Sequence, residues 1–508
     1  MNDGTAERPL GRAVGWLVGS RWVARALGVG RTMVLSAILL PADFGHAVLV
    51  MSIVLFVEAI TDMKVNFSLI RSRDQDDGLY DTAWTLQIIR GLLCGTGLAL
   101  GAPWIGAFYG DPKLIAPLYL LALSLAIGGF VNVGMAQFFK EMDFRKVFIA
   151  NVASRLVALV VSVVIAILTQ SFWAVVIGYV VQRMVDVLVS YMMHPRRPRL
   201  GLTTLGDIGQ HSAWLMVQNV LFQILLRADV FLIGKYAGAA ALGPYYLAKM
   251  LAELIGTELA SAFRVALFSK FVSHDHRHDA GARAVLAFAT LSSATQAALL
   301  IGAPASLLLA LCAKDLVSFA LGAAWAPTTF FLQLFSANAL FGIAAAAPAS
   351  SILAAGHTRL VALRQAIGLA VFIPSVAFAA QTFGLGGVAV AVVLTTAVSC
   401  AYSFVVAARD VTGNWREVAS GVLRIATATA MLGLASGLIL AAMPDIAQRW
   451  HPLHLLRLLA AGSGGLAAYC GTLWLIWQLR GKPDGIETMA ARMLLKIASR
   501  RRKERAKR

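Results

Sequence analysis

The chain has 508 residues, of which 59% are hydrophobic and 14% are charged, and its mean hydropathy is +0.74. A soluble globular protein averages roughly 45–50% apolar and about 25% charged residues, so these values exclude the soluble classes of protein. The net charge of +18 does not indicate nucleic-acid binding, because the Lys and Arg residues are spread over many short loops and one tail.

Continuous apolar runs of about 20 residues predict an all-α polytopic membrane protein. The shorter alternating strands of an outer-membrane barrel, about 10 residues each, do not occur. Connections are short, so we expect no inserted soluble domain. In chain order we expect about fourteen transmembrane helices, over residues 14–40, 45–67, 83–108, 116–138, 147–168, 172–193, 210–235, 242–268, 284–310, 326–347, 360–382, 386–408, 418–442 and 453–478.

The connections between these helices alternate in charge along the chain. Those after even-numbered helices hold 14 Lys and Arg residues, and those after odd-numbered helices hold 4. Because cytoplasmic loops are enriched in Lys and Arg, this alternation predicts that both ends of the chain lie in the cytoplasm. The basic tail over 480–508 is then expected to lie near anionic lipid headgroups.

Two similar turns predict an internal repeat. The segments "LLPADFGHAVLV" and "AGAAALGPYYLA" place Gly45 and Gly243 shortly before a helix, 198 residues apart. The offset covers six helices, an even number, so the two halves keep one orientation and form parallel repeats. We therefore expect two six-helix lobes around a central cavity, followed by two C-terminal helices. The expected boundaries are 1–200 for the N-lobe, 201–412 for the C-lobe, 413–479 for the last two helices and 480–508 for the tail.

Several ionisable residues lie at membrane depth within the expected helices. A charge at the bilayer centre costs roughly 2.5–3.5 kcal/mol or more, so such a residue is a candidate for function. The cations that we select as candidates for binding an anionic substrate are Arg21, Arg25, Arg31, Arg90, Arg155 and Arg227. The carboxylates that we select for ion coupling or charge pairing are Glu58, Asp62, Asp186, Asp229, Glu253 and Glu258.

The depths of these residues predict groupings. Arg21 and Arg25 on the first helix match Glu58 and Asp62 on the second, and each pair is spaced i,i+4 on one helical face. The other expected groupings are Arg227 and Asp229 with Lys249 and Glu253, and Arg155 with Asp186 and Arg183. Two interpretations remain open, namely structural ion pairs and a hydrated cavity that meets a charged substrate.

The balance of charge favours an anionic substrate. With Arg183, Lys249, Arg264 and Arg364 included, cations at membrane depth number 10 against 6 carboxylates. Surplus guanidinium groups suit phosphate, which they bind through paired hydrogen bonds.

Signals for metal or nucleotide chemistry are weak. The loop "SHDHRHDAGAR" holds His274, His276 and His278, for which a solvated loop is favoured over a metal site. A Walker A motif, G-x-x-x-x-G-K-[ST], does not occur in the sequence. We expect neither a metal nor a cofactor.

Several segments together resemble bacterial lipopolysaccharide and exopolysaccharide exporters, the Wzx-like oligosaccharide flippases of the multidrug/oligosaccharidyl-lipid/polysaccharide (MOP) superfamily. They are "SRWVARALGVGRTMVLSAILLPADFG", "YDTAWTLQIIRG", "FYGDPKL", "EMDFRKVF", "HPRRPRL" and "RADVFLIGKYAGAAALGPYYLAKMLAELIGTEL". The resemblance implies translocation of an undecaprenyl-diphosphate-linked oligosaccharide across the bacterial inner membrane by alternating access, coupled to an ion gradient. It implies membrane lipids and polysaccharide polymerase or assembly proteins as further partners, and no enzymatic activity.

Two other functions remain as alternatives. A multidrug or small-molecule cation antiporter of the same superfamily would require an acidic cavity, which the charge count does not favour. A membrane glycosyltransferase or polymerase would place carboxylates or arginines in sizeable outer loops, and the expected outer loops are short. The glycan, the coupling ion and the oligomeric state have no signature in the sequence.

Overall fold

The computed structural model describes residues 7–62, 69, 77–203, 213–275, 280–355, 358–409, 411–444 and 449–479. Within these ranges the regular structure is α-helix and 3-10 helix alone, which confirms the all-α fold class. Nine helices in the same ranges are long and apolar enough to cross a membrane. The chain divides into two compact units, Met1–Tyr246 with Ala380–Leu385 and Leu247–Ala379 with Gly386–Arg508.

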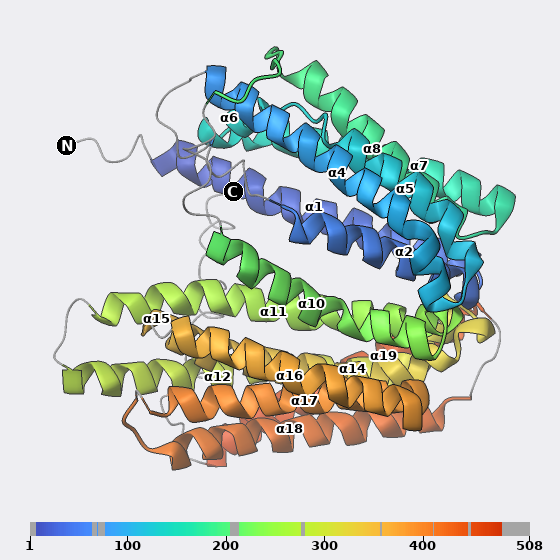
Figure 1. Cartoon of the computed structure of the whole chain (residues 1–508). Helices are drawn as coiled ribbons and strands as arrows, with labels where there is room; N and C mark the ends of the chain where they lie inside the picture. Colours follow the sequence, from blue (N-terminus) through green and yellow to red (C-terminus); the bar gives the residue numbers. More distant parts are fainter. Residues whose placement is uncertain are drawn as a thin grey trace, which may run out of the picture. The chain divides into compact units, whose positions relative to one another are not determined.

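The first unit is a bundle of long helices that pack side by side (Figure 1). Helix α7 packs against α8 and α1, α4 against α5, α5 against α8, and α2 against α10. Its core is aliphatic, with Leu49, Leu118 and Leu121 fully buried. The elements are α1 (Glu7–Ile38), α2 (Pro41–Ile60), α4 (Asp77–Tyr109), η1 (Pro112–Leu114), α5 (Ile115–Gly128), α6 (Met135–Lys140), α7 (Phe144–Thr169), α8 (Trp173–Met193), α10 (Ala213–Tyr236) and η2 (Ala239–Ala241).

In the second unit, α12 packs against α14, α15 and α18, and α18 packs along α19. A buried ionic cluster joins α13 to α19, because Asp315 Oδ1 lies 2.9 Å from His454 Nδ1 and 3.0 Å from Arg457 Nε. The elements are α11 (Leu242–Asp275), α12 (Ala280–Leu311), α13 (Ala313–Ala320), η3 (Ala323–Trp325), α14 (Pro327–Ala344), α15 (Ala346–Ala354), α16 (Thr358–Thr382), α17 (Gly384–Ala407), α18 (Trp415–Ala442) and α19 (Pro452–Leu479).

Each of the fourteen expected ranges falls on a helix of the structure, although fourteen as the number of membrane spans stays a prediction. The range 116–138 was wrong as one continuous helix, because α5 ends at Gly128 and α6 begins at Met135. The Gln87 side-chain amide of α4 lies 3.2–3.4 Å from the carbonyl oxygens of Gly128, Gly129 and Val131 and donates to them. It thereby satisfies carbonyls that a helix end leaves without a partner.

Each of the two glycines of the expected repeat packs against the backbone of the turn that precedes the other glycine. A Cβ atom on Gly45 would collide with the carbonyl oxygen of Ala239, and one on Gly243 would collide with the carbonyl oxygen of Pro41. Ala239 and Gly243 follow Pro41 and Gly45 by the same 198 residues. Such a reciprocal contact is typical of two copies related by a two-fold axis, so the geometry supports the parallel repeat.

The expected lobe boundaries at residues 200 and 412 stay a prediction. The tail over 480–508 lies outside the described residues.

Candidate functional site

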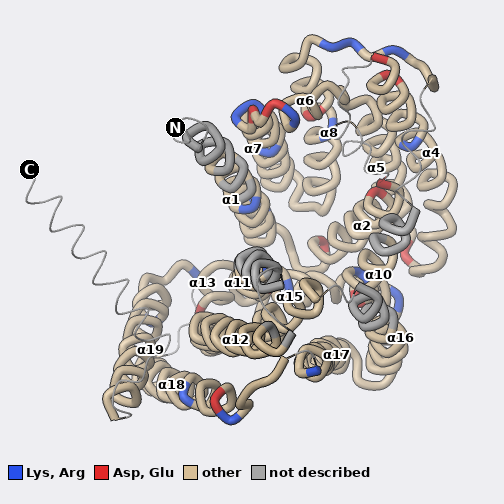
Figure 2. The backbone as a smooth tube through the Cα atoms, turned by 90° about the vertical axis from the view of Figure 1, so that its left-hand side faces the viewer, with Lys and Arg blue, Asp and Glu red and all other residues tan. Residues whose placement is uncertain are grey.

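The first unit holds a network of charged side chains among apolar helices. Figure 2 shows how few of the described residues are Lys, Arg, Asp or Glu. Arg183 of α8 is paired with Glu58 of α2, and the hydroxyl of Tyr179 donates to Glu58 Oε2 at 2.9 Å. Arg183 also donates to the Tyr179 oxygen at 2.8 Å and lies 3.9 Å from Asp186. One guanidinium therefore joins two carboxylates and one phenol.

A second pair extends this network to α4. Arg90 Nη1 lies 3.7 Å from Asp62 Oδ1, just beyond the end of α2. The sequence had suggested partners for Glu58 and Asp62 on the first helix. The contacts described at these carboxylates come from Arg183 of α8 and Arg90 of α4. Their expected grouping with Arg21 and Arg25 stays a prediction.

Two further arginines form what we call the arginine pair, Arg31 of α1 and Arg155 of α7. Arg31 Nη2 donates to the carbonyl of Val175 at 3.1 Å, and Arg155 Nη1 donates to the carbonyl of Ala24 at 3.3 Å. Their charges repel each other. Among the described residues, no carboxylate lies within 4.0 Å of either guanidinium.

Small residues make room for the arginine pair. A Cβ on Gly178 of α8 would lie 3.0 Å from Arg31 Nη2, and a Cβ on Gly28 of α1 would lie 3.9 Å from Arg155 Nη1. The buried hydroxyl of Ser162 also borders Gly178 and has no hydrogen-bond partner in the described part of the chain. Asp186 is the nearby anion, since the charges of Arg183 and Arg155 both act on its carboxyl.

The end of α8 is fixed by a neutral histidine outside the membrane-spanning segments. His194 Nε2 donates to Gln137 Oε1 at 3.2 Å, and its Nδ1 accepts from the backbone N–H of Arg196 at 3.1 Å. Burial, followed by the charge of Arg196, lowers the pKa of His194 below its usual range. The ring is therefore neutral at pH 7 and holds α8 against α6.

One of the two candidates on α10, Asp229, has a partner that the sequence did not suggest. Asp229 is fully buried and accepts a hydrogen bond of 2.7 Å from the hydroxyl of Tyr245. Arg227 is half-buried on the same helix. Their expected grouping with Lys249 and Glu253 stays a prediction.

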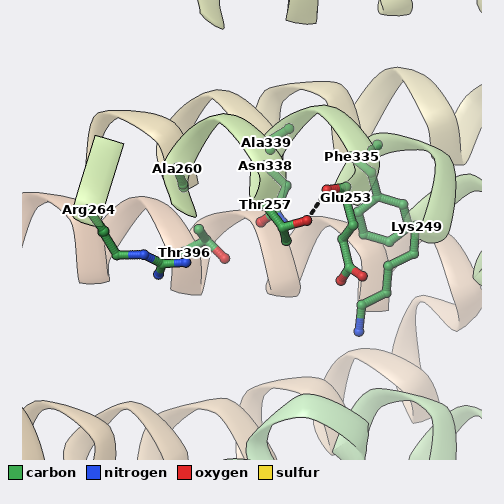
Figure 3. Close-up of a pocket in the computed structure, with 12 residues that line it drawn as sticks. Lys249, Glu253, Thr257, Ala260, Arg264, Phe335, Asn338, Ala339 and Thr396 are labelled. Atoms are coloured by element: carbon green, nitrogen blue, oxygen red, sulfur yellow. Dashed lines mark hydrogen bonds between the residues drawn. The ribbon is translucent and has the colours of Figure 1, made fainter. Parts of the chain in front are cut away.

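The second unit holds a polar groove along α11, drawn in Figure 3. Lys249, Glu253 and Arg264 line it, together with Asn338 of α14 and Thr396 of α17. Its volume is about 180 Å³. Glu258, the other candidate on α11, is half-buried and does not line this groove.

Other candidates lie partly or wholly outside the described residues. Arg25 is exposed on α1, whereas nothing is described of the side chains of Arg21 and Arg364. His276 and His278 lie outside the described ranges, as does the side chain of His274. In the part of the chain that the structure describes, no group of three His, Cys, Asp or Glu side chains could hold a metal ion.

Sequence reasoning missed the uncharged polar residues of these sites, chiefly Tyr179, Gln87, Ser162 and Asn338. A weak signal existed for Tyr179, which precedes Arg183 by four residues and so shares its helical face. The others have no signal in the sequence, because their roles depend on which neighbouring helix packs against them.

Comparisons with known proteins agree with the resemblance seen in the sequence. A family described as polysaccharide biosynthesis protein matches residues 34–330, more than half of the chain. The succinoglycan biosynthesis transport protein ExoT of Rhizobium meliloti is 22% identical over 57% of this chain, which spans 59% of the length of ExoT. The lipopolysaccharide biosynthesis protein WzxC of Escherichia coli is 23% identical over 78% of this chain and 81% of its own length.

Solved structures share the fold. The lipid II flippase MurJ, in an inward closed conformation, has a TM-score of 0.70 at 11% identity and covers 92% of this chain and 99% of its own. An inward-facing multidrug resistance transporter of the MATE family, in the MOP superfamily, has a TM-score of 0.57 at 15% identity over 80% of this chain and 95% of its own. The chain is thus a multi-pass membrane protein that belongs to the polysaccharide biosynthesis protein family.

Proposed function

We propose that this protein is a flippase that moves an undecaprenyl-diphosphate-linked oligosaccharide across the bacterial inner membrane by alternating access. The family match supports this role, and so do relatives whose names refer to succinoglycan transport and lipopolysaccharide biosynthesis. The MurJ-like fold is compatible with it. No enzymatic step is part of the proposal, because moving a lipid between leaflets breaks no covalent bond.

The arginine pair is the single observation that carries the proposal. Arg155 stands near the middle of α7, one of the apolar spans, and Arg31 reaches it from α1. A guanidinium has five N–H donors, and each of the two donates to one backbone carbonyl. Asp186 is near Arg155 but also faces Arg183, so positive charge stays in surplus here. Such a surplus is costly in a membrane, and a diphosphate would offset it through paired hydrogen bonds.

The remaining sequence candidates enter the proposal in other roles. Glu58 and Asp62 are neutralised by Arg183 and Arg90, so we assign these four residues to structure. Asp186 and Glu253 stay candidates for coupling to an ion gradient. The charges of the loops support a cytoplasmic location for both chain ends. A cation antiporter would require the opposite charge beside α1 and α7.

Proteoliposomes that contain the full chain test the proposed function. An undecaprenyl-diphosphate-linked oligosaccharide is placed in both leaflets, and an external glycosidase digests whatever reaches the outer surface. We expect the protein to expose the inner-leaflet pool to digestion, with or without an imposed pH or sodium gradient. Protein-free liposomes are the control. An inner pool that stays protected under every gradient, together with uptake of a cationic dye, would show a cation transporter instead.

A further inference from the structure

The groove along α11 has the size of a subsite and not of a complete substrate site. Its volume of about 180 Å³ is below the roughly 300–1,000 Å³ of pockets for drug-sized ligands. Its floor is formed by small residues where α11 meets α14, since a Cβ on Gly256 would lie 3.0 Å from the Cβ of Ala339. The groove therefore fits one ring-sized group laid against the helices.

The uncharged groups that line the groove present hydrogen-bond acceptors. The hydroxyl of Thr257 donates to the carbonyl of Glu253 at 2.6 Å, and that of Thr396 donates to the carbonyl of Val392 at 3.0 Å. Each hydroxyl proton is thus directed into its own helix, so toward a ligand these hydroxyls can act only as acceptors. Figure 3 shows Thr257 and Asn338 side by side, with Thr396 between them and Arg264.

Asn338 gives the strongest indication of a ligand. Its Oδ1 atom is buried, and no described residue donates a hydrogen bond to it. Buried polar atoms in proteins are nearly always hydrogen-bonded, so this oxygen is available as an acceptor for a ligand in the groove. A hydroxyl group supplies such a donor, whereas an ionised phosphate does not.

The charged residues of the groove also disfavour a phosphate. Lys249 and Arg264 stand 15 residues apart on α11, about 22 Å along the helix axis, so they do not form a joint clamp. The Glu253 carboxylate lies between them and would repel an anion.

We propose that the α11 groove binds one neutral, hydroxyl-bearing sugar unit of the lipid-linked substrate, with Asn338 Oδ1 accepting from a sugar hydroxyl. This inference rests on the proposed flippase function and adds a subsite for the glycan, separate from the arginine pair.

Binding to the full chain in detergent tests the subsite. The probes are bare undecaprenyl diphosphate and undecaprenyl diphosphate that carries one galactose, glucose or N-acetylglucosamine. We expect the wild type to bind at least one sugar-bearing lipid more tightly than the bare lipid. Asn338→Leu keeps the shape and removes the acceptor, so it should reduce that preference roughly tenfold, the effect of one hydrogen bond, without weakening binding of the bare lipid.

Two further variants separate the subsite from a structural role. Asn338→Asp keeps an acceptor and should keep the preference, while Gln333→Leu, an exposed amide on α14 outside the groove, should behave as the wild type. A wild-type preference that survives in Asn338→Leu would overturn the inference alone, and so would equal binding of all four lipids. Failure of the wild type to bind any of them would overturn the proposed function as well.

Discussion

At the scale of single residues, the charged side chains of the first unit are arranged as a shared network. Arg183 and Glu58 keep only 22% and 25% of their side-chain surfaces exposed. Tyr179 bridges the two, so the removal of one charge leaves two polar groups without a partner. A buried polar group without a hydrogen-bond partner lowers stability by more than the intact hydrogen bond contributes to it.

A double-mutant cycle on Glu58 and Arg183 measures this coupling. We expect Glu58→Ala and Arg183→Ala each to lower the free energy of unfolding by about 1–3 kcal/mol, the range for hydrogen bonds to charged groups. The double variant should lose clearly less than the sum, because neither charge is left alone. Unfolding in mixed micelles gives the values, and additive losses would show that the two side chains act independently.

Sequence reasoning found the charged positions but not most of their partners. Arg155, Arg183 and Asp186 lie near one another as the spacing on two neighbouring helices suggested. The structure adds Arg183 of α8 as a partner of Glu58 and Arg90 of α4 as a partner of Asp62, which the sequence did not suggest, because matching depths say nothing about which helices are neighbours. The depth of a residue in the membrane follows from counting residues along its own helix. Which helix lies beside it depends on how all the helices of the bundle pack.

At the scale of elements, apolar runs predicted where helices lie, and local polar contacts decided where some of them end. At the break after Gly128, the Gly128 carbonyl accepts from Gln87, which is 41 residues away on α4. The turn glycines were found from the sequence because their spacing repeats. The reason for glycine at these positions is the collision that a side chain would cause with a backbone carbonyl.

Alanine substitutions test the contact between the repeats. Gly45→Ala and Gly243→Ala should each destabilise the protein by about 1–3 kcal/mol, the range for overpacking, since a backbone carbonyl cannot turn away as a side chain can. Gly30→Ala on α1 is the matched control, because a Cβ there has open space. Thermal unfolding of the purified variants gives the comparison. Equal melting temperatures for all three would show that the turns do not touch.

At the scale of the whole molecule, composition and loop charge predicted the class of protein, and the family match and the fold confirm it. The central cavity, the lobe boundaries and the cytoplasmic ends stay predictions. These three predictions concern the arrangement of the two compact units and their orientation in the membrane. That arrangement depends on packing over large surfaces, which no short sequence motif encodes. The account combines diphosphate binding at the arginine pair with a sugar subsite in the second unit.

The central claim is that Arg31 and Arg155 hold the diphosphate during transport. The decisive measurement is the rate at which proteoliposomes expose inner-leaflet lipid-linked oligosaccharide, compared between the wild type, the double variant Arg31→Ala/Arg155→Ala and the exposed control Arg416→Ala. We predict that the double variant, folded and inserted normally, is slower by roughly tenfold or more, as expected for lost charge-assisted hydrogen bonds, and that the control is unchanged. A double variant that transports at the wild-type rate would contradict the claim.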